Sequence, residues 1–421
     1  MTHSTAWRLA LSAAIIVCVA GARPLSAAEV APAASAATPA AVDLPYMLDA
    51  RVVGDVSRVR FIADMSVPVE AAVFGLADPY RIVIDLPEVR FVLPDGAGTT
   101  GRGMVSAFRY GLISAGKSRI VIDVSGPVAI DKQFVVPPAN GQPARLVVDL
   151  VPTTRDKFLA AAKAYRDAHE VAAEKSAAAT GVAGGGDADK PLVVLDPGHG
   201  GIDTGTRSAD GTVEKDVVLA FARVLGGKLL ATGRYRVVYT RTDDSYVALG
   251  DRVQIARNQH AGLFVSIHIN SFPGSSVRGA IVYTVSDAAS DKMAAALADS
   301  ENQSDALAGI DVAAKDSDQV KDILLDLTQR ETRNFGVVFA QALVSHLGKA
   351  TQMFKVPHQE ASFKVLEAPD VPSALIELGY ISNAADEKQL VSPDWQAGVA
   401  DSMVSAIDGY FGKEAVVSGK P

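Results

Sequence analysis

The stretch Leu192-Val193-Val194-Leu195-Asp196-Pro197-Gly198-His199-Gly200-Gly201 decides the fold of the larger part of this chain. Its four consecutive aliphatic residues are typical of a strand buried on both faces, and Pro197 and Gly198 end that strand. His199 therefore follows on a glycine-lined turn at the carboxyl end of a strand. Ligands bind at that edge of open α/β sheets, so His199 is the first candidate functional residue, with a solvated turn histidine as the alternative.

Strand and helix patterns alternate from residue 191 onward, which predicts an α/β domain with a mostly parallel sheet flanked by helices. In the strand expected at 262–270, alternation places Ser266, His268 and Asn270 on one face, beside His199 if the two strands are neighbours. The other expected strands are 192–195, 236–240, 279–285 and 373–380, and the expected helices are 215–230, 249–259 and 320–347.

One carboxylate, Glu377, lies in the otherwise apolar strand expected at 373–380. A catalytic role is one interpretation, and a buried ion pair with Arg252 or Lys364 is the other. The remaining histidines of this region lie outside any such pattern, and we interpret them as structural or surface residues on helices or loops: His260, His346 and His358.

Residues 44–152 contain short strands bounded by proline and glycine, which predict a small all-β, sandwich-like domain. An Arg-aliphatic-Asp strand recurs at 81–86, 119–124 and 145–150, with a looser copy at 58–63. This region has no histidine, and its acidic residues are scattered. We therefore expect a binding or targeting module without catalytic residues.

The remaining segments are typical of a signal peptide for export and of linkers between domains. Residues 1–28 are typical of a signal peptide cleaved after Ala28, and residues 29–43 of a flexible leader. Residues 153–190 predict a linker, with a solvated helix at 155–178 and a glycine-rich tether at 181–189. The mature chain is thus expected outside the cytoplasm without a membrane span.

The composition limits which partners the protein can bind and which residue types can hold a metal. A net charge of −8 without a basic run argues against nucleic acid or an anionic membrane as the partner. The only cysteine, Cys18, belongs to the expected signal peptide. Any metal in the mature protein must therefore be held by His, Asp or Glu.

Four blocks together resemble the zinc-dependent N-acetylmuramoyl-L-alanine amidases of the cell-division type. They are the stretch 196–201, Glu214, the stretch 266–270 and the stretch 376–383, and they lie in the family's order. The resemblance spans residues 191 to about 411 and implies a catalytic domain at 191–413. It implies His199, Glu214 and His268 as zinc ligands and Glu377 as the catalytic residue.

The preceding β region resembles the AMIN module of these amidases, which implies peptidoglycan binding and septal targeting in the periplasm. The implied reaction cleaves the amide between muramic acid and L-alanine of the stem peptide, in cell-wall splitting at division. Two imidazoles and one carboxylate leave a fourth zinc position for water, as this reaction needs. Alternatives are a zinc peptidase acting within the stem peptide and a non-catalytic wall-binding protein. For Glu214, complementing the dipole of the following helix is the alternative role.

Residues 286–321 form a connection several times longer than an ordinary loop. Residues 291–303 have helical composition, and Asp299, Glu301 and Asp305 offer carboxylates near it. In the resembled amidases an insertion here blocks the metal until a LytM-type activator displaces it, which implies autoinhibition with Glu301 as the blocking residue. A solvated surface helix is the alternative. The apolar stretch 323–327 is then either the activator's docking site or core.

Overall fold

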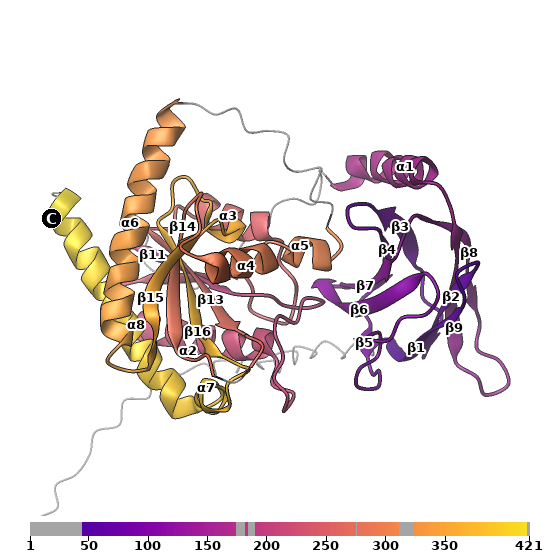
Figure 1. The fold of residues 1–421 in the computed structure, drawn as a ribbon, viewed down its shortest axis with the longest axis horizontal. Coiled ribbons are helices and arrows are strands. Elements are labelled where there is room, and N and C mark those ends of the chain that lie inside the picture. The colour runs from indigo at the N-terminus through magenta and orange to yellow at the C-terminus, as the bar shows by residue number, and fades with distance from the viewer. Residues whose placement is uncertain (1–43, 174–181, 184–189, 275, 311–322, 419–421) are drawn as a thin grey trace, which may run out of the picture. The chain divides into compact units, whose positions relative to one another are not determined.

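The computed structural model describes residues 44–173, 182–183, 190–274, 276–310 and 323–418 (Figure 1). An all-β domain is followed by an α/β domain, as the sequence predicts. The expected signal peptide and leader lie outside the described residues. No helix within the described ranges is both long enough and apolar enough to cross a bilayer.

The β domain consists of two antiparallel sheets that share one apolar core. Its strands are β1 (Tyr46–Gly54), β2 (Val59–Met65), β3 (Ala72–Leu76), β4 (Arg81–Pro87), β5 (Arg90–Phe91), β6 (Val105–Ser114), β7 (Lys117–Val124), β8 (Val128–Val136) and β9 (Ala144–Pro152). The order is β5-β1-β2-β9-β8 in one sheet and β3-β4-β7-β6 in the other. Two packed sheets make this domain a sandwich, as expected.

The arginines and aspartates of the repeated strand pattern form ion pairs between the central strands of each sheet. In antiparallel β4 and β7, Asp85 lies opposite Arg119, and the arginine Nε is 2.6 Å from the carboxylate. In β2 and β9, Arg60 lies opposite Asp149 at the same 2.6 Å. Opposite charges at directly opposed positions stabilise a strand pair and fix its register.

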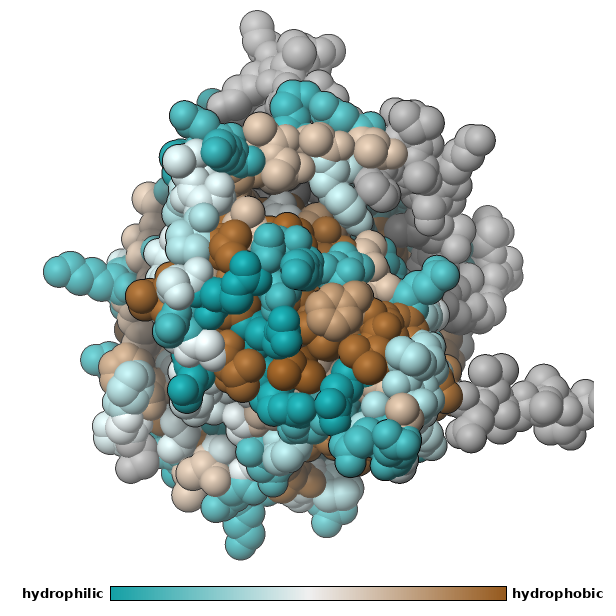
Figure 2. Space-filling model, turned by 90° about the vertical axis from the view of Figure 1, so that its right-hand side faces the viewer, coloured by the Kyte–Doolittle hydropathy of each residue, from teal (hydrophilic) through white to brown (hydrophobic). Residues whose placement is uncertain are grey.

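The outer face of the five-stranded sheet mixes apolar and charged side chains. Phe134 and Val136 on β8 are each 39% exposed, and the Arg60 guanidinium lies 5.9 Å from the centre of the Phe134 ring. Figure 2 faces this domain and shows hydrophobic side chains interleaved with hydrophilic ones.

Helix α1 (Arg155–Ala173) begins where a helix was predicted, but it is not simply a solvated connection. Phe158 is only 3% exposed and belongs to the core of the β domain, and Tyr165 stacks on Phe74 of β3 at 4.2 Å. The prediction of a solvated helix was wrong because it weighed only the high content of Ala and charged residues. It did not consider that the two aromatic side chains lie on one face of the helix and can pack against a neighbouring domain.

The glycine-rich tether also contains a two-residue strand, β10 (Val182–Ala183), which pairs with an edge of the second sheet.

The α/β domain is built on a seven-stranded sheet of order β10-β12-β11-β13-β16-β14-β15. Most neighbours are parallel, and β14 runs antiparallel to β16. The strands are β11 (Leu192–Pro197), β12 (Arg236–Tyr239), β13 (Leu263–Asn270), β14 (Ala280–Val285), β15 (Met353–Ala361) and β16 (Ser373–Tyr380). Because β11 and β13 are neighbours, the polar positions of β13 lie next to the end of β11, as predicted.

Helices cover both faces of this sheet. One apolar core lies under α2 (Glu214–Ala231), α6 (Ile323–Leu347) and α8 (Pro393–Ser418). The other lies under α3 (Leu249–Asn258), α4 (Lys292–Glu301) and the short helix η1 (Lys364–Leu366). Two further short helices are α5 (Ser304–Leu307) and α7 (Ala384–Leu390), the latter capped by the Asn383 side chain.

Strand β15 was not predicted, and His358, expected on a helix or loop, lies within it. Its Nε2 is 2.9 Å from the Thr284 hydroxyl of the neighbouring strand. The pattern was missed because Pro357 and the charged residues Lys355 and Glu360 interrupt the stretch. Such residues are tolerated only at a sheet edge, and β15 is the last strand of its sheet.

Candidate metal centre and catalytic site

His199 lies on the turn that follows β11, with a left-handed backbone φ of 56°. A non-glycine residue in this region is uncommon and persists where the surroundings hold it. Two buried arginines do so here. Arg241 donates to the carbonyls of Pro197 and Gly198 at 2.9 and 2.8 Å, and Arg252 donates to the carbonyl of His199 at 2.7 Å.

His268 lies on β13 next to this turn, and its imidazole packs against the backbone of Gly198. A Cβ at position 198 would lie 2.4 Å from the His268 ring. Only glycine at that position therefore allows the two histidine rings to meet, with centres 4.8 Å apart. The pairing of β11 with β13, which the sequence analysis gave as a condition, accounts for this proximity.

Glu214 is the first residue of α2, and its side chain turns toward the histidines rather than toward solvent. It is 1% exposed. One carboxylate oxygen accepts the backbone N–H of Ile269 at 2.9 Å, and the other accepts the N–H of Thr206 at 2.8 Å. These contacts hold the carboxylate beside His199 and His268.

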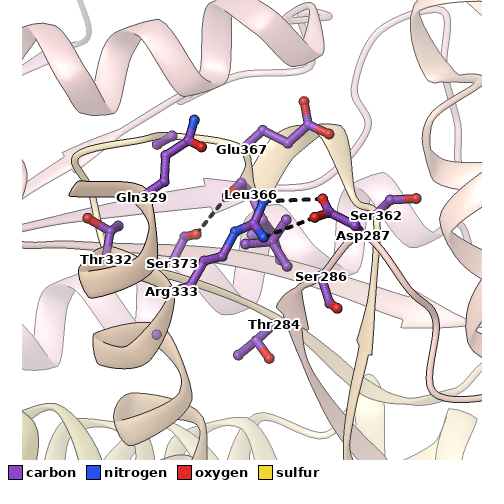
Figure 3. A pocket seen from close by; sticks show the side chains of 13 residues that line it. Thr284, Ser286, Asp287, Gln329, Thr332, Arg333, Ser362, Leu366, Glu367 and Ser373 are labelled. Carbon is purple, nitrogen blue, oxygen red and sulfur yellow. Dashed lines mark hydrogen bonds and ion pairs between the residues drawn. The ribbon is translucent and has the colours of Figure 1, made fainter. Parts of the chain in front are cut away.

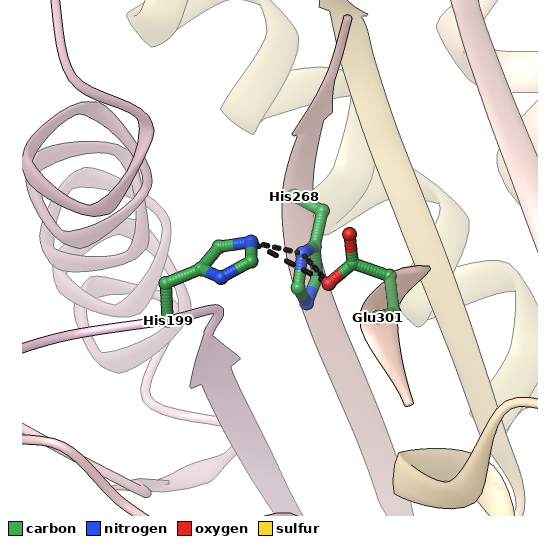
Figure 4. Close-up of side chains that lie close together, drawn as sticks. All are labelled: His199, His268 and Glu301. Carbon is green, nitrogen blue, oxygen red and sulfur yellow. Dashed lines mark hydrogen bonds and ion pairs between the residues drawn. The ribbon is translucent and has the colours of Figure 1, made fainter. Parts of the chain in front are cut away.

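Glu301 is the last residue of α4 and reaches the same point (Figure 4). The other two carboxylates proposed for this segment are elsewhere. Asp299 is exposed, and Asp305 accepts the Tyr246 hydroxyl at 2.7 Å and the Leu249 N–H at 2.9 Å. A carboxylate at a helix carboxyl end is disfavoured by the helix dipole, so the position of Glu301 needs a compensating positive group.

Four side-chain atoms converge, one each from His199, His268, Glu214 and Glu301. His199 Nε2 lies 3.0 Å from Glu214 Oε1, 3.2 Å from His268 Nδ1 and 3.4 Å from Glu301 Oε2. His268 Nδ1 is 3.3 Å from each of the two carboxylates. Tetrahedral zinc with bonds of about 2.0–2.1 Å would hold its ligand atoms about 3.3 Å apart, which is close to these five separations. His199, His268 and Glu301 form a group that could hold a metal ion.

Asp203 was not singled out in the sequence, although it follows His199 by four residues. Its Oδ2 is 2.9 Å from His199 Nδ1 and also accepts the hydroxyl of Ser304 from α5. A carboxylate on Nδ1 places the proton there and leaves Nε2 free for a metal. The spacing His-x-x-x-Asp alone is too common to have revealed this.

The electrostatics of the cluster favour a cation. Although burial disfavours a charged imidazole, Asp203, Glu214 and Glu301 raise the pKa of His199 well above its usual value. Burial also disfavours the charged form of Asp203, yet His199 lowers the pKa of this carboxyl to about 2. Three carboxylates thus face two imidazoles in a buried site, an excess of negative charge that a divalent cation neutralises.

Glu377 lies on β16 directly opposite His268 in the strand register. It is 1% exposed, and among the described residues no group forms a hydrogen bond with its Oε2. Burial, and then the charges of Glu214 and Glu301, raise the pKa of Glu377 well above its usual value. The alternative partner Arg252 instead forms an ion pair with Asp196 at 2.7 Å.

A cavity of about 290 Å³ lies elsewhere, between the start of β16 and the side of α6 (Figure 3). It contains an Arg333–Asp287 ion pair at 3.3 Å. None of the residues predicted for the site lines it. At the predicted site, Glu301 of α4 instead lies within 3.4 Å of both imidazoles.

Two family profiles and several known proteins are similar to this chain. The family profile described as N-acetylmuramoyl-L-alanine amidase matches residues 193–409, and that of the AMIN domain matches residues 51–150. The chain is 33% identical to N-acetylmuramoyl-L-alanine amidase AmiC of Escherichia coli O6:H1 over 359 residues, covering 82% of this chain and 84% of that protein. It is 32% identical to AmiC of Neisseria meningitidis serogroup B, covering 90% and 93%. The solved structure of amidase AmiC2 of Nostoc punctiforme aligns with a TM-score of 0.39 at 28% identity, covering 54% of this chain and 99% of that one.

Proposed function

We propose, from the premise that this chain belongs to the N-acetylmuramoyl-L-alanine amidase family, that it hydrolyses the muramoyl–L-alanine amide of peptidoglycan with a zinc ion held by His199, Glu214 and His268. The convergence of their donor atoms at 3.0–3.3 Å supports this assignment. Bound there, zinc would polarise the amide carbonyl and lower the pKa of water toward ~7.

Glu377 is the proposed proton carrier of the reaction. Its buried carboxylate has an oxygen without a hydrogen-bond partner among the described residues, and it lies opposite His268. It would take a proton from the attacking water and deliver it to the leaving amine of L-alanine. A raised pKa suits a group that must both accept and return a proton near neutral pH.

Helix α4 is proposed to keep the enzyme inactive. Glu301 Oε2 lies 3.3 Å from His268 Nδ1 and 3.4 Å from His199 Nε2, so it would compete with water for a bound zinc ion. A carboxylate at this point would keep substrate and water from a bound zinc ion. We propose that a LytM-type activator displaces the helix. The stretch 323–327 stays the proposed docking site, and its side chains lie outside those described.

The chain is proposed to act in the periplasm, in septal wall splitting during cell division. There the β domain would bind peptidoglycan, and its mixed apolar and charged outer sheet face suits a polymer of sugars and peptides. Deleting residues 44–152 should weaken binding to whole sacculi and placement at the septum, without slowing hydrolysis of soluble fragments. Sacculus binding equal to that of the full chain would contradict this role.

The decisive experiment measures zinc content and the products released from muropeptides, using the full chain and its Glu301→Ala variant. An amidase frees intact stem peptides from the glycan, and mass spectrometry identifies them. Cleavage within the stem peptide would instead favour a zinc peptidase. Bound zinc without any product from either protein would favour a wall-binding protein that has lost catalysis.

A further inference from the structure

Three neutral polar side chains are buried beneath α4 without partners. The Tyr283 hydroxyl, the Gln359 amide and the Tyr380 hydroxyl have no hydrogen-bond partner among the described residues. Their residues are 0%, 1% and 0% exposed. A buried polar group without a partner destabilises the state in which it is buried, so the arrangement beneath α4 needs an explanation.

All three lie on the sheet face that α4 covers. Tyr283 and Tyr380 share an apolar core with Ala294 and Ala298 of α4. Gln359 is the register partner of Tyr283 on the neighbouring strand, so the two side chains leave the sheet on the same side. The carboxyl end of α4 also lies against this part of the sheet, because its C-cap residue Asn302 donates to the carbonyl of Ser362, just after β15, at 2.7 Å.

Helix α4 spans from these tyrosines to the metal centre. Burial, and then the charges of Glu377, Tyr380 and Asp291, raise the pKa of Tyr283. Asp291 is the N-cap of α4, and Glu301 at the other end meets the imidazoles. A helix of this length covers about 15 Å. Its displacement would therefore uncover the metal centre and the three polar side chains as one continuous surface.

We propose that Tyr283, Gln359 and Tyr380 bind the amide groups of the stem peptide on the leaving-group side of the scissile bond. This inference rests on the proposed function, in which Glu377 protonates the leaving amine. We place the peptide that begins at this amine over β14, because this strand lies on the side of β16 opposite to β13 and His268. All three side chains are uncharged and can donate and accept hydrogen bonds, which suits peptide N–H and C=O groups.

The strand register gives the distances from Glu377 to Tyr283 and Gln359, and a short peptide can span them. Ile281 lies opposite Glu377, and Tyr283 is two residues further along β14. With strand spacings of about 4.8 Å and a rise of about 3.3 Å per residue, the Cα of Tyr283 lies roughly 8 Å from that of Glu377. Gln359, one strand further, lies roughly 12 Å away by the same spacings. An extended peptide of about two to four residues covers these distances.

The test uses the full zinc-loaded chain carrying Glu301→Ala, with Tyr283→Phe, Gln359→Leu or Tyr380→Phe added singly. Each addition should raise KM for a muropeptide about 3- to 10-fold with little change in kcat, as expected for loss of a neutral hydrogen bond made equally in ground and transition states. In the chain with Glu301 intact, the same changes should leave the unfolding midpoint equal or higher, because they remove unpartnered groups. Tyr239→Phe, on the opposite face of the sheet, is the matched control and should change neither quantity.

An unchanged KM in all three variants would overturn the inference. So would a KM shift accompanied by an equal shift in Tyr239→Phe, or a lower unfolding midpoint, because each indicates a structural role. If the Glu301→Ala chain binds zinc but releases no stem peptide, the proposed function itself has failed, and this result is distinct from a normal rate with an unchanged KM.

Discussion

Arg252 Nη1 donates to Asp196 Oδ1 at 2.7 Å in the interior of the α/β domain, where both side chains are at most 2% exposed. The same guanidinium donates to the carbonyls of Pro197 and His199. One arginine thus neutralises the charge at the end of β11 and holds the turn that presents His199. Asp196 of β11 also accepts hydrogen bonds from the hydroxyls of Thr240, just after β12, and of Ser266 in β13. One carboxylate therefore connects three neighbouring parallel strands.

Replacing Arg252 with Met should therefore lower the free energy of unfolding by about 3–5 kcal/mol, because Asp196 is left as an uncompensated buried charge. Denaturant unfolding measures this loss. The matched control is Arg257→Met, which removes an exposed ion pair with Asp370 and should cost less than about 1 kcal/mol. Equal effects of the two substitutions would contradict the special role of the Asp196 pair.

The same pair predicts a pH dependence. Although burial raises the pKa of Asp196, Arg252 and the two hydroxyls more than offset it, and the pKa in the folded protein is lowered. Its stabilising contribution is complete above the unfolded pKa of about 4 and is lost as the pH falls through the lower folded value. The stability gap between the parent chain and Asp196→Asn should thus shrink on acidification below about pH 4. A gap that stays constant with pH would contradict the assignment.

From the residues alone, His199 and His268 were expected to lie together only if their two strands are neighbours, and the structure confirms that condition. The role of metal ligand for these histidines and for Glu214 came from the resemblance to the amidases, and it stays a prediction. His199 and His268 end neighbouring strands with simple hydrophobic patterns, and Glu377 stands out as a carboxylate in an apolar strand. Asp203 and the arginines that hold the turn were not recognised, because their roles depend on contacts between distant segments. Arg252 was considered only as a partner for Glu377, and the structure pairs it with Asp196.

The fold was predictable to a similar extent. Buried parallel strands have continuous aliphatic runs, and these strands were found. Strand β15 was not, because its exposed side and Pro357 remove the hydrophobic pattern. The packing of α1 on the β domain depends on Phe158 and Tyr165, two side chains that propensity alone does not weigh.

Removing either proposed histidine ligand should remove the metal. We expect His199→Ala and His268→Ala to lose both zinc and hydrolysis while the domain stays folded, because each contributes one of the converging donors. Metal analysis after dialysis and circular dichroism test this. His358→Ala, on β15, is the control and should retain zinc. Full zinc occupancy in either of the first two variants would rule that residue out as a ligand.

Glu377→Gln should retain zinc but lower kcat by roughly 10²–10⁴-fold, because an amide preserves the shape of the side chain but cannot accept the proton. The measurement compares zinc content and turnover in the Glu301→Ala background. Loss of zinc together with activity would show that Glu377 is a ligand and not the proton carrier.

The last prediction concerns the carboxylate that α4 places at the metal centre. Glu301 lies within 3.4 Å of both imidazoles although burial raises the pKa of its carboxyl, and its helix end disfavours negative charge. Only a favourable interaction at the metal centre compensates for these costs, so Glu301→Ala should weaken the closed state.

We expect Glu301→Ala to raise hydrolysis without an activator by roughly 10- to 100-fold, the scale of one lost hydrogen bond to a charged group. Asp299→Ala, two residues earlier and exposed, is the matched control and should leave the basal rate unchanged. Removal of residues 287–318 should act in the same direction as Glu301→Ala. If both changes leave the basal rate as it was, with zinc bound and the fold intact, α4 does not restrain the enzyme. The segment must then serve another purpose.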